Sequence, residues 1–279
     1  MVKNNLIKEL KKVLKEQYSI YIQKIYKSKE STVGNVYIIE TKQNKYVGKI
    51  YENLKYAQTM IDIYSFLNNN NLYAPSILKS KTKLNYTELL NQKFLVIYSY
   101  LEGIQIKEII NNFLSENIIQ LASYLRKIHD LTNKENKLKL TLSPINISKE
   151  INRYSILHFD LTTTNIFYNK KNNKIGFIDF DDAKYGPAIV DVSILIGNLF
   201  ISKRRGIEID KIKIFLDEYY KDDLLLKEKE SAFIKECIIK WIDYITNMNE
   251  FDSSTKDSFK IRKELVSKIN FLNYKLNED

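Results

Sequence analysis

The spacing of apolar residues divides the chain into a strand-rich first part and a helix-rich remainder. Apolar positions at helical spacing predict a first helix within 1–16 and another over 54–67. Alternating or continuous apolar runs predict short strands, which lie at 18–26, 35–41, 45–51 and 94–98, and Pro75 is expected to open one more. The first part is therefore predicted to form a small antiparallel sheet with a helix before it and a helix within it.

Helical periodicity dominates the rest of the chain. Helices are predicted at 106–113 and 116–130, and the polar segment 132–150 is expected to be a loop. Two short strands follow at 165–169 and 174–179. From Ala188 onward only helices are predicted, over about 188–203, 208–220, 223–246 and 256–274. This order predicts an α+β fold with a small antiparallel sheet lobe, residues 1–98, and a larger, mainly helical lobe, residues 99–279.

Residues 156–191 combine acidic residues, an asparagine and a histidine with flanking apolar residues. Their sequence is ILHFDLTTTNIFYNKKNNKIGFIDFDDAKYGPAIVD. His158, Asp160 and Asn165 form the pattern H-x-D-L-x-x-x-N. Asp179 ends the strand predicted at 174–179. Phosphoryl transfer requires a carboxylate that orients and deprotonates a hydroxyl, and divalent metal on the phosphate oxygens. Asp160 suits the first task, and the hard oxygens of Asn165 and Asp179 suit Mg²⁺. We expect His158 to brace the loop by hydrogen bonds.

The same polar residues have a plain structural reading as turn formers, because Asp and Asn are common in turns. The loop pattern alone would leave that reading open. An apolar strand that ends in Asp179 follows the loop at the distance expected of a metal-binding strand, and it favours the catalytic interpretation.

Lys49, in the strand YVGKIY, is the candidate phosphate-binding residue of the first lobe. A kinase uses such a lysine to reach the α- and β-phosphates of the nucleotide, whereas the alternative is a solvated strand lysine. The acid that pairs with it is open among Asp62, Glu52 and, by hydrogen bonding, Gln58. Gly34 is the only glycine in the preceding turn, so the G-x-G-x-x-G cradle of protein kinases is absent.

The segments LHFDLTTTNIFY and IGFIDFDDAKYGPAIVDVS resemble the aminoglycoside phosphotransferase and choline kinase-like superfamily, whose members are small-molecule relatives of protein kinases. The similarity covers about 28–199. It implies a two-lobed protein-kinase-like fold, with Asp160 as the catalytic base, Asn165 and Asp179 as Mg²⁺ ligands, Lys49 on phosphate and Asp191 as a structural aspartate. The remaining nucleotide contacts that it implies are Gly34, Val36, Ser99, Leu101 and Ile178.

Two departures from the family pattern stand out. Phe159 occupies a position where the family often has glycine, and the helix at 54–67 lacks an evident acid for Lys49. A nucleotide-binding pseudokinase or regulatory module is therefore the alternative to an active enzyme. A protein kinase proper is disfavoured, because the segment after Asp179 is too short for an activation segment and contains no A-P-E.

The resemblance predicts an ATP- or GTP-dependent, Mg²⁺-dependent kinase that phosphorylates a hydroxyl of a small molecule. The acceptor is left open between an aminoglycoside-like antibiotic and an amino-alcohol metabolite such as choline or homoserine. Acidic residues of 207–279 suit a polycationic acceptor, but solvated helix faces explain them equally well.

Charge and composition narrow the partners. The formal net charge is +10, with 31 basic and 18 acidic residues in 1–206 against 13 and 16 in 207–279. Such a charge raises nucleic acid as a partner, but the lysines are scattered without a dense basic tract, so none is expected. Cys237 is the only cysteine, no signal peptide is evident and no run is long enough to span a membrane. We expect a cytoplasmic protein without a membrane partner.

Overall fold

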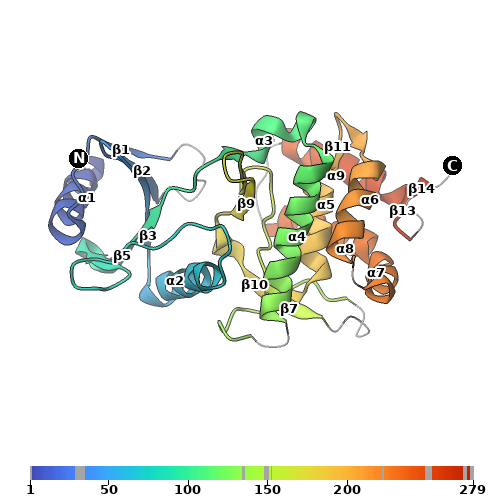
Figure 1. Ribbon diagram of the computed structural model, residues 1–279, viewed down its shortest axis with the longest axis horizontal. Coiled ribbons are helices and arrows are strands. Elements are labelled where there is room, and N and C mark those ends of the chain that lie inside the picture. Colours follow the sequence, from blue (N-terminus) through green and yellow to red (C-terminus); the bar gives the residue numbers. More distant parts are fainter. Residues whose placement is uncertain are drawn as a thin grey trace. The chain divides into compact units, whose positions relative to one another are not determined.

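The computed structural model describes residues 2–28, 35–133, 136–147, 151, 153–221, 223–248, 253–272 and 275–276. The chain forms two compact units, Met1–Glu102 and Gly103–Asp279. Figure 1 labels their helices and strands.

The first unit is a five-stranded antiparallel sheet with the strand order β1-β2-β3-β5-β4. Its strands are β1 (Lys24–Lys27), β2 (Val36–Glu40), β3 (Lys45–Tyr51), β4 (Thr87–Leu89) and β5 (Lys93–Ser99). Its helices are α1 (Val2–Tyr18) and α2 (Leu54–Asn69). On central strand β3, Lys49 is paired with Val36 of β2 and with Val96 of β5.

Helices α1 and α2 pack on opposite faces of this sheet. Leu14 of α1 lies in a buried cluster with Ile50 of β3 and other apolar residues of the sheet. Helix α2 packs against β3 and β5, where the rings of Tyr64 and Tyr98 lie 5.0 Å apart. Because neighbouring strand residues point to opposite faces, Lys49 lies on the α2 side, next to Ile50 on the α1 side.

The second unit combines small sheets with a bundle of helices. Two of the sheets have the orders β10-β7 and β6-β8-β9. The strands are β6 (Ile104–Gln105), β7 (Tyr154–Leu157), β8 (Ile166–Asn169), β9 (Lys174–Phe177), β10 (Lys184–Pro187), β11 (Ile201–Ser202), β12 (Gly206–Ile207), β13 (Ile269–Asn270) and β14 (Lys275–Leu276). The α-helices are α3 (Ile106–Ile109), α4 (Ser115–Thr132), α5 (Ile189–Leu199), α6 (Ile209–Tyr219), α7 (Leu224–Ser231), α8 (Ile234–Met248) and α9 (Ser253–Ser267).

Helix α5 lies at the centre of the helical packing. Nearly all of its residues are buried, and it packs against α8, which in turn packs against α9. Helix α4 packs against α6 and against β7, as Figure 1 shows for the green and orange helices. Helix α4 also packs against β9, so the bundle supports strands β7 and β9.

The predicted α+β fold class is confirmed, since one unit carries an antiparallel sheet and the other is mainly helical. Several predicted elements were wrong in detail. The strand expected at 18–26 begins only at Lys24, because Ser19 takes a left-handed backbone (φ 56°) that ends α1, and the Ile20 N–H returns to the Leu14 carbonyl. No strand opens at Pro75, where the structure has only an isolated bridge at Ile77.

The helical prediction from Ala188 onward was wrong in several details. Short hairpins β11–β12 and β13–β14 interrupt it, and the helix expected over 256–274 ends at Ser267. The helix expected over 223–246 is split into α7 and α8 by a turn at 232–233. That turn contains no Gly or Pro, so the local sequence carries no mark of the break.

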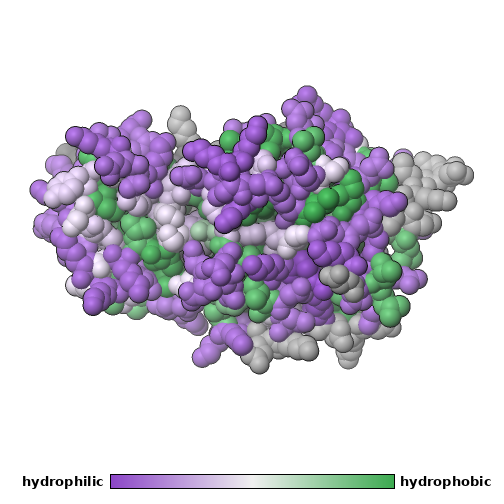
Figure 2. All heavy atoms as spheres, viewed as in Figure 1, coloured by the Kyte–Doolittle hydropathy of each residue, from purple (hydrophilic) through white to green (hydrophobic). Residues whose placement is uncertain are grey.

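The surface is mostly polar, as expected when the apolar side chains form a core. Figure 2 shows mostly hydrophilic residues on the viewed face, with apolar side chains in scattered patches. Leu224 and Leu225 of α7 are among the most exposed large apolar residues, at 73% and 82%. No helix within the described ranges has the length and apolar character needed to cross a bilayer.

Candidate functional site

The loop between β7 and β8 carries the predicted catalytic residues, and α5 holds its backbone in place. The buried Asp191 carboxylate accepts the N–H of His158 at 2.6 Å and the N–H of Phe159 at 2.9 Å. Phe159 has a left-handed backbone (φ 67°), which non-glycine residues rarely adopt. The two bonds from Asp191 fix this turn, which leads directly into Asp160, and they bear out the structural role implied for Asp191.

Asp160 and Asn165 lie side by side in the loop. The Nδ2 amide of Asn165 donates to the Asp160 carboxylate oxygen Oδ2 at 2.8 Å and to the Asp160 main-chain carbonyl at 3.0 Å. Burial raises the pKa of Asp160; His158 and the Asn165 hydrogen bond oppose that shift, while the charges of Asp182 and Asp179 reinforce it. A carboxylate with a raised pKa is a better proton acceptor than an ordinary aspartate.

His158 braces the loop, as predicted. Its Nε2 lies 2.8 Å from the carbonyl oxygen of Ile178, and its Nδ1 accepts the N–H of Asp160 at 3.3 Å. The Nε2 contact requires a proton on that nitrogen, because the Ile178 carbonyl can only accept. The ring also packs against Phe180, with centroids 4.4 Å apart. The histidine thereby joins the Asp160 loop to the segment that precedes Asp179.

Asp179 follows β9 in a left-handed conformation (φ 65°, ψ 62°), and its side chain is exposed. The preceding residue ties it to the catalytic loop, because the N–H of Ile178 donates to the main-chain carbonyl of Asn165 at 3.0 Å. The second unit thus brings Asp160, Asn165 and Asp179 into one local assembly.

The oxygen donors of this assembly suit a hard cation. Asn165 donates to Asp160 only through Nδ2, so its Oδ1 takes no part in those bonds, and the Asp179 carboxylate supplies anionic oxygens. No group of three or more His, Cys, Asp or Glu side chains arranged as a metal cage occurs in the described part of the chain. Magnesium requires no such cage, since it retains several waters and phosphate oxygens as ligands.

Asn198 is a supporting residue that the sequence did not point to. It lies near the end of α5, and its Nδ2 donates to the carbonyl of Leu161 at 3.1 Å. Its Oδ1 accepts from Arg262 of α9 at 3.0 Å. No motif or spacing relates these three positions, so only the fold reveals that α5 and α9 both support the catalytic loop.

The predicted nucleotide contacts of the first unit lie on or beside its sheet. Val36 and Lys49 are neighbours across β2 and β3, and the Lys49 ammonium lies 5.8 Å from the ring centroid of Tyr51. Ser99 ends β5, where its hydroxyl accepts the N–H of Ser76 at 2.8 Å, and Leu101 is buried just beyond. The position predicted for Gly34 lies outside the described residues.

The candidates for the partner of Lys49 have contacts elsewhere. The Glu52 carboxylate pairs with Lys93 at 2.8 Å, and Asp62 accepts from Gln58 at 2.7 Å along α2. These contacts do not select any of the three candidates for Lys49.

A cavity of about 820 Å³ opens in the first unit beside the β2–β3 turn. It includes Ser99 and Tyr100 in its lining but not Val36, Lys49 or Leu101. The predicted nucleotide contacts therefore do not converge on this cavity.

Similarity to a known protein family lies in the same segment of the sequence. The phosphotransferase enzyme family matches residues 147–222, the part of the chain that contains Asp160, Asn165 and Asp179. No curated protein sequence matches the chain.

Many solved structures share the fold. The amicoumacin kinase hAmiN, solved with AMP-PNP, Ca²⁺ and Ami, is 17% identical, with 97% of each chain covered and a TM-score of 0.71. A microcompartment-associated aminopropanol kinase is 10% identical over 94% of this chain and 96% of its own, with a TM-score of 0.66. The choline kinase LicA from Streptococcus pneumoniae is 11% identical over 94% of this chain and 99% of its own, with a TM-score of 0.59.

At these identities the structural likeness establishes the fold alone, and the family match concerns residues 147–222. The chain therefore has a kinase-like fold, and its predicted resemblance to the aminoglycoside phosphotransferase and choline kinase-like superfamily is confirmed.

Proposed function

We propose that this protein transfers the γ-phosphoryl group of a magnesium nucleotide, ATP or GTP, to a hydroxyl group of a small molecule. The observation that carries the proposal is the pairing of Asp160 with Asn165 in a loop whose backbone is held by Asp191. Asp179 directly follows Ile178, whose N–H donates to the main-chain carbonyl of Asn165. Phosphoryl transfer depends mainly on positioning and electrostatics, and this arrangement supports both.

Asp160 is the proposed catalytic base. Asn165 holds one carboxylate oxygen, Oδ2, and so restricts the carboxylate to one orientation. The other oxygen, Oδ1, accepts the proton of the acceptor hydroxyl as that oxygen attacks the γ-phosphorus.

Asn165 and Asp179 are the proposed metal ligands. Their side-chain oxygens are hard donors of the kind that Mg²⁺ binds together with substrate phosphates. When bound, the ion would neutralise charge on the phosphate oxygens. In the first unit, Lys49 is the proposed phosphate contact, and Gly34, Val36, Ser99 and Leu101, with Ile178 of the second unit, are proposed to contact the nucleotide.

The acceptor class is proposed as a hydroxylated small molecule that carries amino groups. The structural neighbours include kinases named for an antibiotic, an amino alcohol and choline. An acceptor of this kind bears positive charge, which the exposed acid Asp182 near Asp160 would attract.

Replacement of Asp160 tests the proposal. The chain would be screened with amino alcohols, aminoglycosides and other hydroxylated antibiotics by acceptor-dependent release of ADP. Asp160→Ala should lower turnover by about 10²–10⁴-fold, the usual contribution of a general base, while nucleotide binding measured by calorimetry is kept.

Asp210→Asn, on the exposed side of α6, is a matched control that should leave turnover unchanged. Undiminished turnover by Asp160→Ala would contradict the assignment of the base. Nucleotide binding without transfer to any acceptor would instead favour the pseudokinase alternative.

A further inference from the structure

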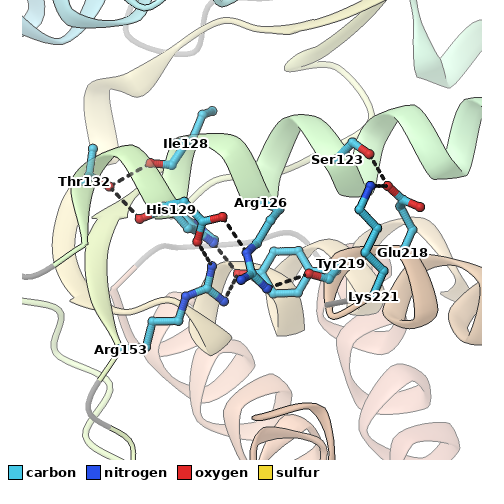
Figure 3. Close-up of polar contacts among 10 residues, drawn as sticks. Ser123, Arg126, Ile128, His129, Thr132, Arg153, Glu218, Tyr219 and Lys221 are labelled. Carbon is cyan, nitrogen blue, oxygen red and sulfur yellow. Dashed lines mark hydrogen bonds and ion pairs between the residues drawn. The ribbon is translucent and has the colours of Figure 1, made fainter. Parts of the chain in front are cut away.

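A buried series of hydrogen-bonded polar residues connects α6 with the catalytic loop. Figure 3 shows that the hydroxyl end of Tyr219, at the end of α6, points toward His129 of α4 and Arg153, which precedes β7. Tyr219 is 1% exposed and His129 is 0% exposed, so water does not satisfy their polar atoms. None of these residues is a proposed catalytic, nucleotide-binding or metal-binding residue, and Arg153 and Tyr219 lie outside the two motif segments that resemble the family.

The donors and acceptors of this series can be assigned in order from Arg153 to Asp191. The Nη1 of Arg153 donates to the Tyr219 hydroxyl at 3.1 Å. Because that contact uses the tyrosine oxygen as acceptor, the Tyr219 proton is free to point at Nδ1 of His129, 2.5 Å away. The ring then carries its own proton on Nε2, which faces Asp191 Oδ2 at 3.5 Å.

Arg153 is itself held in place. Its Nη2 donates to Asp130 at 2.8 Å, and Asp130 also accepts from Arg126 at 2.6 Å. Arg126 in turn donates to the Tyr219 main-chain carbonyl at 2.9 Å. The tyrosine is thereby fixed at both its hydroxyl and its backbone.

This series of hydrogen bonds ends at Asp191, the residue that holds the backbone of the catalytic loop. Asp191 uses both carboxylate oxygens on the N–H groups of His158 and Phe159, directly before Asp160. A neutral His129 with its proton on Nε2 adds a donor to that carboxylate, whereas the other tautomer would place a lone pair against it. Burial lowers the pKa of His129, which agrees with a neutral ring.

We propose that Tyr219 is a positioning residue for phosphoryl transfer: its hydroxyl fixes the tautomer of His129, and His129 orients the Asp191 carboxylate that holds the Asp160 loop. This inference rests on the proposed function for its catalytic meaning. The tautomer and the loop geometry can be measured without any turnover.

The chain contains only two histidines, so long-range ¹H–¹⁵N spectra can resolve both rings. In the wild type, His129 should show a protonated Nε2 and an unprotonated Nδ1. Tyr219→Phe removes the donor to Nδ1 and should produce a mixture of tautomers. An Nδ1-protonated or doubly protonated His129 in the wild type at neutral pH would overturn the proposal, even if the variant failed to fold.

Tyr220→Phe is the matched control. Tyr220 is equally buried and adjacent, but its hydroxyl donates to Glu230 at 2.5 Å. Amide hydrogen exchange at His158 and Phe159 should be at least about 10-fold faster in Tyr219→Phe and unchanged in Tyr220→Phe, because only the first variant disturbs Asp191. Equal acceleration in both variants, or none in Tyr219→Phe, would mean that Tyr219 serves only packing.

The catalytic meaning is tested once an acceptor is known. Tyr219→Phe should lower kcat about 10-fold with KM for nucleotide and acceptor within about twofold, because the positioning of Asp160 affects the transition state more than substrate binding. A change confined to KM would contradict the proposal. If no acceptor is phosphorylated at all, the proposed function fails, while the spectra and exchange rates still decide the role of Tyr219.

Discussion

Phe159 combines a left-handed backbone with a large, buried side chain. Its φ is 67°, its exposure is 4%, and its ring lies 5.6 Å from that of Tyr244 on α8. A left-handed backbone costs a non-glycine residue about 1–2 kcal/mol. The hydrogen bond from its N–H to Asp191 and the packing of its ring offset that cost. This explains how the loop accommodates phenylalanine at a position where glycine is common in the family.

Phe159→Gly should therefore destabilise the protein. The change relieves about 1–2 kcal/mol of backbone strain but loses about 3–5 kcal/mol of aromatic burial, so a net loss of about 1–4 kcal/mol is expected. Urea denaturation would measure it as a lower midpoint with an unchanged m-value. A variant as stable as the wild type would show that relief of backbone strain fully offsets the loss of burial, contrary to this expectation.

At the scale of elements, the contact between α5 and α8 depends on close approach. A Cβ at Gly197 of α5 would lie 3.2 Å from Cγ2 of Ile238 on α8. Ile238 is completely buried and has little room to move. Since α5 carries both Asp191 and Asn198, this packing contributes to the support of the catalytic loop.

Gly197→Ala should lower stability by about 1 kcal/mol. The gain in helix propensity is about 1 kcal/mol, but overpacking in a dense core typically costs about 1–3 kcal/mol. In an Ile238→Ala background the same substitution should become stabilising, because the clash is gone and the propensity gain remains. Denaturation of the four proteins in this double-mutant cycle gives the coupling, and a cycle without coupling would refute the packing argument.

At the scale of the whole molecule, nucleotide and metal should act together on stability. A ligand at a concentration 100 times its Kd stabilises the folded state by about 2.7 kcal/mol. With about 2 °C per kcal/mol for a protein of this size, MgATP should raise the apparent Tm by about 5 °C. Removal of the metal with EDTA should lower that shift.

Asp179→Asn separates this expectation from unspecific effects of ATP. The variant keeps a similar shape but loses the anionic metal ligand, so ATP should shift its Tm equally with and without Mg²⁺. Thermal denaturation monitored by fluorescence measures both shifts. A full magnesium-dependent shift in the variant would exclude Asp179 as a ligand.

The sequence by itself determined the fold class and the local chemistry of the catalytic segment. Apolar periodicity is a local property, so it predicted α2, α4, β3 and β5 closely. Asp160 and Asn165 are near neighbours along the chain, and a short loop brings them together without help from distant elements. Asp179 needed only one hairpin, β8–β9, to return to that loop.

Only the tertiary structure decided what holds this segment. His129 and Tyr219 are 90 positions apart, and Asn198 and Arg262 are 64 apart. Neither pair belongs to one periodic pattern, because their contacts arise when α4 packs on α6 and α9 approaches α5. The break between α7 and α8 and the place of β4 at the sheet edge were decided in the same way. Local patterning specifies which elements form, whereas burial of their apolar faces against one another specifies which distant polar groups meet.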